Sequence, residues 1–208
     1  MKVLALLGSP RKKGNSETLM HSVLQGVRKA GGKVETVRLF DLNIHPCIGC
    51  GGCDNTGRCV VEDDMQLLYD KVVAADRIIL ASPIYFYNIT AQAKAFVDRT
   101  QALWSRKYRV REGGWWLDNP DRLGYFVSVC ATRGEKVFDG AILTVKYAFD
   151  AMGVKYAGEF LVRGVDHRGE MAKLTDTLEE AEEFGRGIAE GIIMREIAKE
   201  EDSPSRTG

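Results

Sequence analysis

The sequence has no excess of charge of either sign, no long apolar run and almost no cysteine outside one short segment. Its 208 residues include 29 Lys and Arg and 29 Asp and Glu, so the formal net charge is zero. This balance gives no bulk attraction to nucleic acid or to an anionic membrane surface. Because no apolar stretch approaches the roughly 20 residues that span a bilayer, we expect neither a membrane nor a nucleic-acid partner.

An export signal is not evident, although Lys2 followed by apolar residues superficially resembles one. The apolar stretch covers only residues 3–7 and leads into a polar glycine loop, so we interpret it as a buried strand. We therefore expect a cytoplasmic protein in a reducing compartment. Clustered cysteines in such a compartment are more often ligands or redox groups than disulfides.

Two well-known phosphate loops are absent as well. A G-x-x-x-x-G-K-[ST] loop fails because Gly14 is followed by Asn15, and no G-x-G-x-x-G loop follows the first predicted strand. The sequence therefore supports neither a Mg-nucleotide loop nor a dinucleotide loop. No internal repeat is visible, and we expect one domain over residues 1–199 with a disordered tail at 200–208.

Apolar strands alternate with helical segments along the chain. The predicted strands cover residues 3–7, 33–40, 77–81, 123–131 and 154–162. The predicted helices cover residues 16–30, 64–75, 90–104, 135–152 and 174–199, the second of them capped by Asp63 or Asp64. This alternation predicts right-handed crossovers and a parallel sheet with helices on both faces, a three-layer α/β sandwich.

The loop after the first predicted strand has the composition of a phosphate site. Ligands of such sheets bind at the carboxyl ends of the strands. Residues 8–18 read GSPRKKGNSET, which supplies hydroxyls, cationic side chains and the start of a helix. Backbone N–H groups and the helix dipole at that position favour a phosphate. The alternative is a solvated basic turn between strand and helix.

Three consecutive aromatic residues follow the third predicted strand, where residues 82–90 read SPIYFYNIT. Flat rings and freed backbone amides there can flank a planar heterocycle and bond its edge. The alternatives are a hydrophobic plug or a dimer contact. Beside a phosphate loop, this segment indicates a mononucleotide with a flat ring system. A second aromatic pair, Trp115 and Trp116, indicates a substrate cleft or a subunit contact.

Four of the five cysteines fall inside thirteen residues, in the spacing C-x2-C-x2-C-x5-C. They are Cys47, Cys50, Cys53 and Cys59. Interspersed glycines permit the backbone to wrap a metal centre. Four thiolates suit a [4Fe–4S] cluster or an all-cysteine zinc site. A disulfide role for the first two, or a loop without metal, stays open. Cys130 lies in an apolar strand and is interpreted as a packed core thiol.

These motifs together resemble a known family. G-S-P-R-x-x-G-N-S-x-T and S-P-I-Y-x-Y-N resemble the flavodoxin-like NAD(P)H-dependent FMN reductases. The cysteine spacing resembles the motif of archaeal and bacterial iron–sulfur flavoproteins. The resemblance implies a flavodoxin-like α/β fold, a three-layer sandwich around a five-stranded parallel sheet in the order 2-1-3-4-5.

The resemblance also implies the cofactor ligands. The residues expected to hold the FMN phosphate are Ser9, Arg11, Asn15, Ser16 and Thr18. Those expected along the isoalloxazine and ribityl are Pro83, Ile84, Tyr85, Phe86, Tyr87 and Asn88. The loop expected on the other side of the ring contains Ala131, Thr132, Arg133 and Gly134. A [4Fe–4S] cluster would be ligated by Cys47, Cys50, Cys53 and Cys59.

The function implied is that of an FMN-dependent electron-transfer oxidoreductase. It would pass electrons between a ferredoxin-like or NAD(P)H donor and a small acceptor such as oxygen, peroxide or quinone. The flavin carries the chemistry, so we nominate no acid–base residue. One alternative is an NAD(P)H-dependent FMN or quinone reductase with no cluster, and another is a flavin-binding redox-sensing module. Such relatives form homodimers or homotetramers, which we expect here too.

Overall fold

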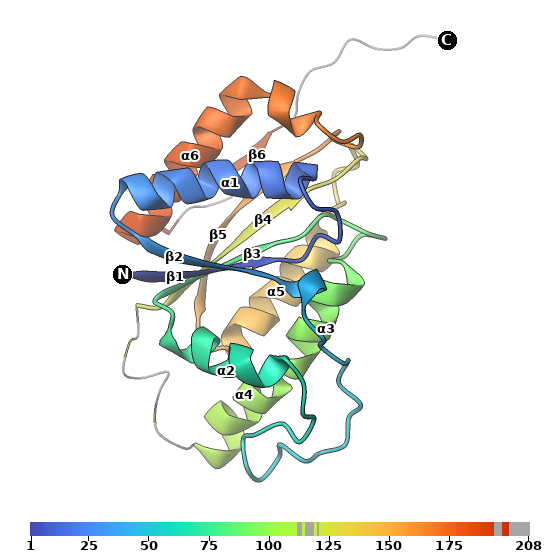
Figure 1. Ribbon diagram of the computed structural model, residues 1–208, viewed down its shortest axis with the longest axis vertical. Coiled ribbons are helices and arrows are strands. Elements are labelled where there is room, and N and C mark those ends of the chain that lie inside the picture. The colour runs from blue at the N-terminus through green and yellow to red at the C-terminus, as the bar shows by residue number, and fades with distance from the viewer. Residues whose placement is uncertain (112–113, 115–118, 120, 194–196, 200–208) are drawn as a thin grey trace.

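The computed structural model describes residues 1–111, 114, 119, 121–193 and 197–199. Within them, a parallel sheet of six strands has the order β2-β1-β3-β4-β5-β6 and forms the middle layer (Figure 1). The strands are β1 (Lys2–Leu7), β2 (Lys33–Arg38), β3 (Arg77–Ala81), β4 (Leu123–Val129), β5 (Lys155–Val162) and β6 (Ile197–Lys199).

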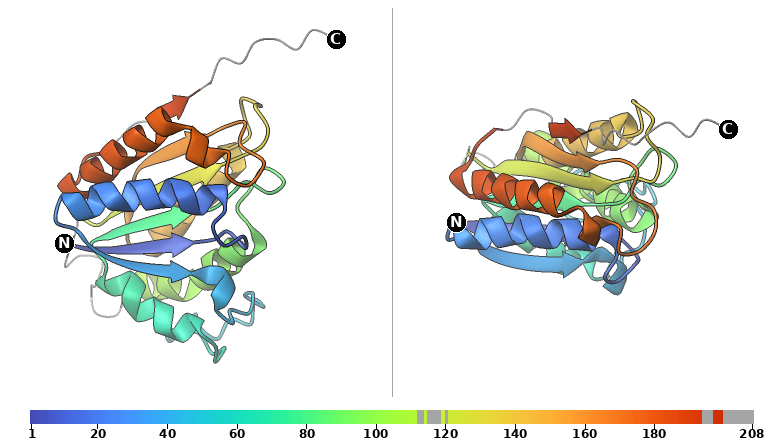
Figure 2. Two further views of the ribbon diagram at one scale, coloured as in Figure 1. Left: turned by 45° about the horizontal axis from the view of Figure 1, so that its top comes forward. Right: turned by 90° about the horizontal axis from the view of Figure 1, so that it is seen from above.

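Helices cover both faces of the sheet (Figure 2). One face carries α1 (Asn15–Lys29) and α6 (Thr175–Glu190). The other face carries α2 (Met65–Ala74), α3 (Ala91–Arg99), α4 (Gln101–Ser105) and α5 (Asp139–Ala151). Short turns of helix are η1 (Leu39–Asp41), η2 (Arg106–Val110) and η3 (Met171–Lys173), of which η2 is a π-helix.

Two apolar cores lie on the two faces of the sheet, because successive side chains of a strand point to opposite faces. In β1, Val3, Ala5 and Leu7 pack into the core beneath α1 and α6. Leu4 and Leu6 pack into the second core, beneath the helices of the opposite face. The near-continuous apolar runs of β1, β3 and β4 are therefore those of strands buried on both sides.

The predicted strand order 2-1-3-4-5 is confirmed, and a short sixth strand extends the sheet beyond β5. The prediction of a single helix over residues 174–199 was wrong. It ends at Glu190 because Gly191 takes a left-handed φ of +76°. Further along the sequence, Ile197–Lys199 pairs with β5. None of the helices in the described part is both long and apolar enough to cross a bilayer.

Several predicted boundaries also shift. The helix predicted for 90–104 is divided into α3 and α4 at Thr100, and the one predicted from residue 135 starts at Asp139. The strand predicted to residue 40 ends at Arg38, where η1 begins. Trp115, Trp116 and the tail predicted for residues 200–208 lie outside the described residues.

Candidate functional site

A pocket of about 110 Å³ lies at the carboxyl ends of the strands, where the sequence predicts the flavin. It joins the loops that follow β1, β3, β4 and β5. Its lining residues are Ser9, Arg11, Gly14, Asn15, Ser16, Pro83, Ile84, Tyr85, Val129, Cys130, Ala131, Val165 and Asp166. Three loops predicted separately from the sequence therefore meet in one place, and a fourth, after β5, joins them.

The phosphate end of this pocket is the start of α1. Gly14 is the N-cap residue, and the first backbone N–H groups of a helix have no partner within the helix. The Ser9 and Ser16 side chains are buried against the pocket. Ser9 Oγ accepts a hydrogen bond from the Arg11 backbone N–H at 3.3 Å, which fixes the turn. This arrangement can bind an anion through backbone N–H groups and hydroxyls.

Asn15 lines the pocket and also bonds the loop after β5. Its side-chain amide donates to the His167 carbonyl at 2.8 Å, and its Oδ1 accepts from the backbone N–H groups of Gly169 and Met171. The side chain is thus engaged with the loop after β5, which it holds beside the pocket. Thr18 does not line the pocket, and its hydroxyl donates to the Gly14 carbonyl at 3.2 Å.

The aromatic segment contributes less surface than predicted. Pro83, Ile84 and Tyr85 line the pocket, whereas Phe86 and Tyr87 do not. Tyr85 and Asn88 exchange two backbone hydrogen bonds, of 2.8 and 3.1 Å, around Phe86 and Tyr87. Both central residues have positive φ values, +50° and +62°. This is the turn geometry that normally selects Asn and Gly, so two bulky residues here are strained.

Asn88 is likewise engaged outside the pocket. Its Oδ1 accepts from the Ile89 backbone N–H at 2.8 Å, and its amide donates to the Thr144 hydroxyl at 3.3 Å. The amide therefore ties the aromatic turn to α5. Asn88 itself does not line the pocket.

Of the loop predicted after β4, only its first residue, Ala131, lines the pocket. Thr132, Arg133 and Gly134 are exposed and do not line it, whereas Val129, Cys130 and Ala131 do. Cys130 is buried as predicted, yet it lies at the pocket wall. Burial raises the pKa of its thiol above the ordinary value.

Two further pocket residues, Val165 and Asp166, escaped the sequence prediction. They follow β5, and the rule that ligands bind at the carboxyl ends of strands applies to that strand too. The strand-end rule therefore indicated this loop, but the loop carries no sequence motif that marks its residues as ligand contacts.

A second cavity, of about 290 Å³, is lined by all four clustered cysteines. Its opposite wall comes from Arg99, Gln101 and Ala102 of α3 and α4, and from Arg109. The loop that bears the cysteines joins β2 to α2 and lies beside α2 and α4, as the cyan segment of Figure 1 shows. Positive φ values at Gly49, Gly51 and Gly57 give it the wrapping predicted from the sequence.

The cysteine side chains differ in their surroundings. Cys47 and Cys50 are exposed, whereas Cys53 and Cys59 are half-buried, and all four are free thiols. Among the described residues, no three His, Cys, Asp or Glu side chains are arranged closely enough to hold a metal ion. Burial raises the pKa of Cys53, while a hydrogen bond from Ser105 acts in the opposite direction.

A buried ion pair closes the base of the cysteine loop. The Arg99 guanidinium donates to both carboxylate oxygens of Asp63, at 2.6 and 3.0 Å. It also donates to the carbonyls of His45 and Val61, two residues before the first cysteine and two after the last. The Tyr69 hydroxyl donates to the Arg99 carbonyl at 2.9 Å. Both ends of the loop are therefore fixed to the end of α3.

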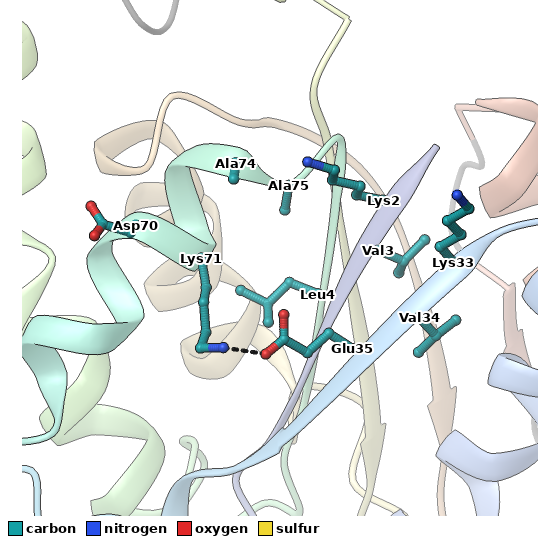
Figure 3. A pocket seen from close by; sticks show the side chains of 10 residues that line it. All are labelled: Lys2, Val3, Leu4, Lys33, Val34, Glu35, Asp70, Lys71, Ala74 and Ala75. Carbon is teal, nitrogen blue, oxygen red and sulfur yellow. Dashed lines mark hydrogen bonds and ion pairs between the residues drawn. The ribbon is translucent and has the colours of Figure 1, made fainter.

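A larger cavity, of about 450 Å³, lies between β1, β2 and α2. Figure 3 shows it with Lys2 and Lys33 at the first residues of their strands and an ion pair between Lys71 and Glu35. No residue predicted for a cofactor lines it, and it opens at the end of the sheet opposite the strand-end loops. Residues predicted for a cofactor line the two smaller cavities instead.

Comparison with known proteins agrees with this geometry. The profile of the NADPH-dependent FMN reductase family matches residues 1–134. The chain belongs to the NADPH-dependent FMN reductase family. The matched residues include the loops after β1, β3 and β4 that line the strand-end pocket.

Within this FMN reductase family the sequence is similar to iron–sulfur flavoproteins, as predicted. It is 44% identical over 99 residues to one from Archaeoglobus fulgidus, covering 48% of this chain and 45% of the relative. It is 40% identical over 133 residues to one from Methanocaldococcus jannaschii, covering 64% of each. The chain thus spans about half to two thirds of the length of the curated relatives it matches.

The fold is shared more widely than the sequence. An NAD(P)H:quinone oxidoreductase from Methanothermobacter marburgensis superposes with a TM-score of 0.70 at 16% identity, covering 90% of this chain and 96% of that one. At this identity the likeness shows the flavodoxin-like arrangement alone.

Proposed function

We propose that this protein is an FMN-dependent electron-transfer oxidoreductase in which Cys47, Cys50, Cys53 and Cys59 hold a [4Fe–4S] cluster. Electrons would pass between a ferredoxin-like or NAD(P)H donor and a small acceptor such as oxygen, peroxide or quinone. The observation that carries the proposal is that all four cysteines line one cavity, apart from the strand-end pocket. The family supports the flavin, and the similar iron–sulfur flavoproteins support the cluster.

The strand-end pocket fits an FMN phosphate. Its anion-binding groups are the N-terminal N–H groups of α1, the buried hydroxyls of Ser9 and Ser16, and the Arg11 side chain. Gly14 allows the tight turn that precedes α1, since a Cβ there would lie 3.2 Å from the Arg11 carbonyl oxygen. Tyr85 and Ala131, from the loops after β3 and β4, would flank the ring.

The cysteine cavity fits a cluster by its donor set. Four thiolates from one loop are the usual ligands of a [4Fe–4S] centre. The turn at Gly49 has room, since a Cβ there would meet nothing within 4 Å. Arg99, at the cavity wall, has a buried Nε without a hydrogen-bond partner among the described residues.

The two cofactors would divide the chemistry: FMN supplies hydride and electron transfer, and the cluster supplies one-electron steps. The residues of the chain bind, orient and shield these groups. Asn15 fixes the loop that carries Asp166 at the pocket, and the pair of Arg99 and Asp63 fixes the base of the cysteine loop. The two cavities share no lining residue, so each cofactor has its own scaffold.

The proposal extends to a homodimer or homotetramer in the cytoplasm that exchanges electrons with a ferredoxin-like protein. Its support is the resemblance to iron–sulfur flavoproteins. The exposed position of Cys47 and Cys50 is consistent with it, because an electron carrier must approach the cluster closely.

The test is an absorption spectrum of protein purified without oxygen, paired with analysis of flavin, iron, sulfide and zinc. We expect bound FMN and about four irons per chain, the content of one [4Fe–4S] centre. Cys53→Ser should lose the iron, whereas Cys130→Ala, which removes the cysteine outside the cluster, should keep it. Protein that binds FMN but holds no iron after anaerobic reconstitution would contradict the cluster.

The second candidate is an NAD(P)H-dependent FMN or quinone reductase with no cluster. It is favoured by the arrangement of the described residues, in which no three His, Cys, Asp or Glu side chains lie close enough together to hold a metal ion. It predicts steady turnover with NAD(P)H that replacement of Cys53 or Cys59 by Ser leaves unchanged. Bound flavin with negligible turnover, together with a reversible disulfide within residues 47–59, would instead indicate a redox-sensing module.

A further inference from the structure

The Ser105 hydroxyl reaches the cysteine loop from a distant part of the chain. Ser105 is the last residue of α4, and its side chain is fully buried. Its Oγ donates a hydrogen bond to Cys53 Sγ, with 3.8 Å between oxygen and sulfur. A buried hydroxyl needs a hydrogen-bond partner, and here that partner is a sulfur atom of the proposed cluster ligands.

The residues after Ser105 hold the same part of the loop. The π-helix η2 begins at Arg106, and π-helices occur frequently at functional sites. Gly57 lies so close that a Cβ on it would be 2.7 Å from the Arg106 Cβ. Arg109 forms a 2.7 Å ion pair with Asp54, the residue after Cys53. Three contacts thus bind residues 53–57 to residues 105–109.

This contact distinguishes Cys53 from the exposed cysteines. Cys47 and Cys50 face solvent, so water can hydrogen-bond their sulfurs. Cys53 is half-buried and receives its hydrogen bond from the protein instead. Hydrogen bonds to ligand sulfurs are among the features that set the reduction potential of an iron–sulfur centre. Such a bond strengthens as negative charge on the sulfur increases, so it favours the reduced state.

We propose that Ser105 is a positioning residue of the cysteine site, which holds Cys53 in place and raises the reduction potential of the bound cluster. The inference rests on the proposed [4Fe–4S] centre. It concerns a residue outside the cysteine motif, 52 positions further along the chain.

The experiment is a redox titration of the reconstituted holoprotein, followed by EPR, together with iron and sulfide analysis. Ser105→Ala should move the midpoint to more negative potential. At the wild-type midpoint potential, the ratio of reduced to oxidised cluster should fall by about threefold to tenfold. This change corresponds to losing part of the free energy of one charge-assisted hydrogen bond. Ser105→Thr keeps the hydroxyl and should restore the wild-type midpoint.

The matched control is Thr100→Val. Thr100 is also buried and lies at the start of α4, but its hydroxyl donates to the Val97 carbonyl at 2.7 Å rather than to sulfur. It should leave the midpoint unchanged. If Ser105→Ala loses iron while Thr100→Val keeps it, positioning of Cys53 is supported directly. If both lose iron, the effect is one of helix stability and the inference fails.

Two other outcomes separate the inference from the proposed function. A wild-type midpoint in Ser105→Ala, or a Ser105→Thr variant that behaves like Ser105→Ala, would overturn the role of Ser105 and leave the cluster assignment intact. A wild-type protein that binds FMN but no iron would overturn both.

Discussion

Arg99 and Asp63 form a deeply buried ion pair. Their side chains are 1% and 0% exposed. Asp63→Asn would leave the guanidinium buried without its counter-charge. We expect a loss of about 3–5 kcal/mol in the free energy of unfolding, measured with urea. The control is Asp98→Asn, which breaks the exposed pair with Lys94 and should change stability by about 0.5 kcal/mol or less. Equal losses in the two variants would contradict the importance of burial.

The same carboxylate predicts how stability depends on pH. Burial acts to raise the pKa of Asp63, but the hydrogen bonds from Arg99 and from the His45 and Met65 backbone N–H groups outweigh it, so the pKa is lowered. A depressed folded-state pKa contributes stability above the unfolded value, about 3.9, and the contribution is lost as pH falls through the folded pKa. Urea unfolding from pH 6 to pH 2 should show this decline. Asp63→Asn should flatten it.

At the scale of the elements, α1 and α6 cross at two glycines. A Cβ on Gly26 would lie 1.8 Å from the Glu182 carbonyl oxygen, and one on Gly185 would lie 1.9 Å from the Val23 carbonyl oxygen. Gly26→Ala should therefore cost about 1–3 kcal/mol despite the better helix propensity of Ala, because the helices must separate. The adjacent, exposed Gln25→Ala is the control and should stay within about 0.5 kcal/mol of wild type. Chemical denaturation of both measures the difference.

The turn at Phe86 and Tyr87 stores strain that a substitution can release. Phe86 is fully exposed and has a φ of +50°, so its side chain gains little from packing. Phe86→Asn, which tolerates this conformation, should raise the free energy of unfolding by about 1 kcal/mol. Phe40→Asn replaces another exposed phenylalanine, one without a positive φ, and should bring no such gain. An unchanged or lower thermal midpoint for Phe86→Asn would show that the ring is stabilised in another way.

A helix or strand could be predicted where the residues of its own segment carry a clear hydrophobic pattern. Apolar runs such as residues 77–81 show a buried strand directly, and the structure places β3 there. The end of α6 at Gly191 was missed because the residues after it, from Ile192 on, continue the helical pattern in the sequence. Pairing of Ile197–Lys199 with β5 is a tertiary contact, and no local pattern of three residues reveals it.

At the scale of the whole molecule, the topology rule predicted where the loops would meet, but not what each side chain would do there. Ser9 and Tyr85 line the pocket because they follow β1 and β3. Asn15 instead bonds residues more than 150 positions away, and Ser105 bonds Cys53 across 52 positions. Such roles depend on three-dimensional proximity, which a motif in one segment does not encode.

Because the two cavities share no lining residue, their ligands should be lost independently. Ser16→Ala removes a buried hydroxyl at the phosphate end of the strand-end pocket, so FMN affinity should fall by about tenfold while iron content stays at the wild-type level. Cys53→Ser should do the reverse. Ser22→Ala, on the same helix as Ser16 but outside the pocket, controls for helix stability. Fluorescence titration with FMN and iron analysis of each variant measure both quantities, and a variant that loses both ligands would show that the two sites depend on each other.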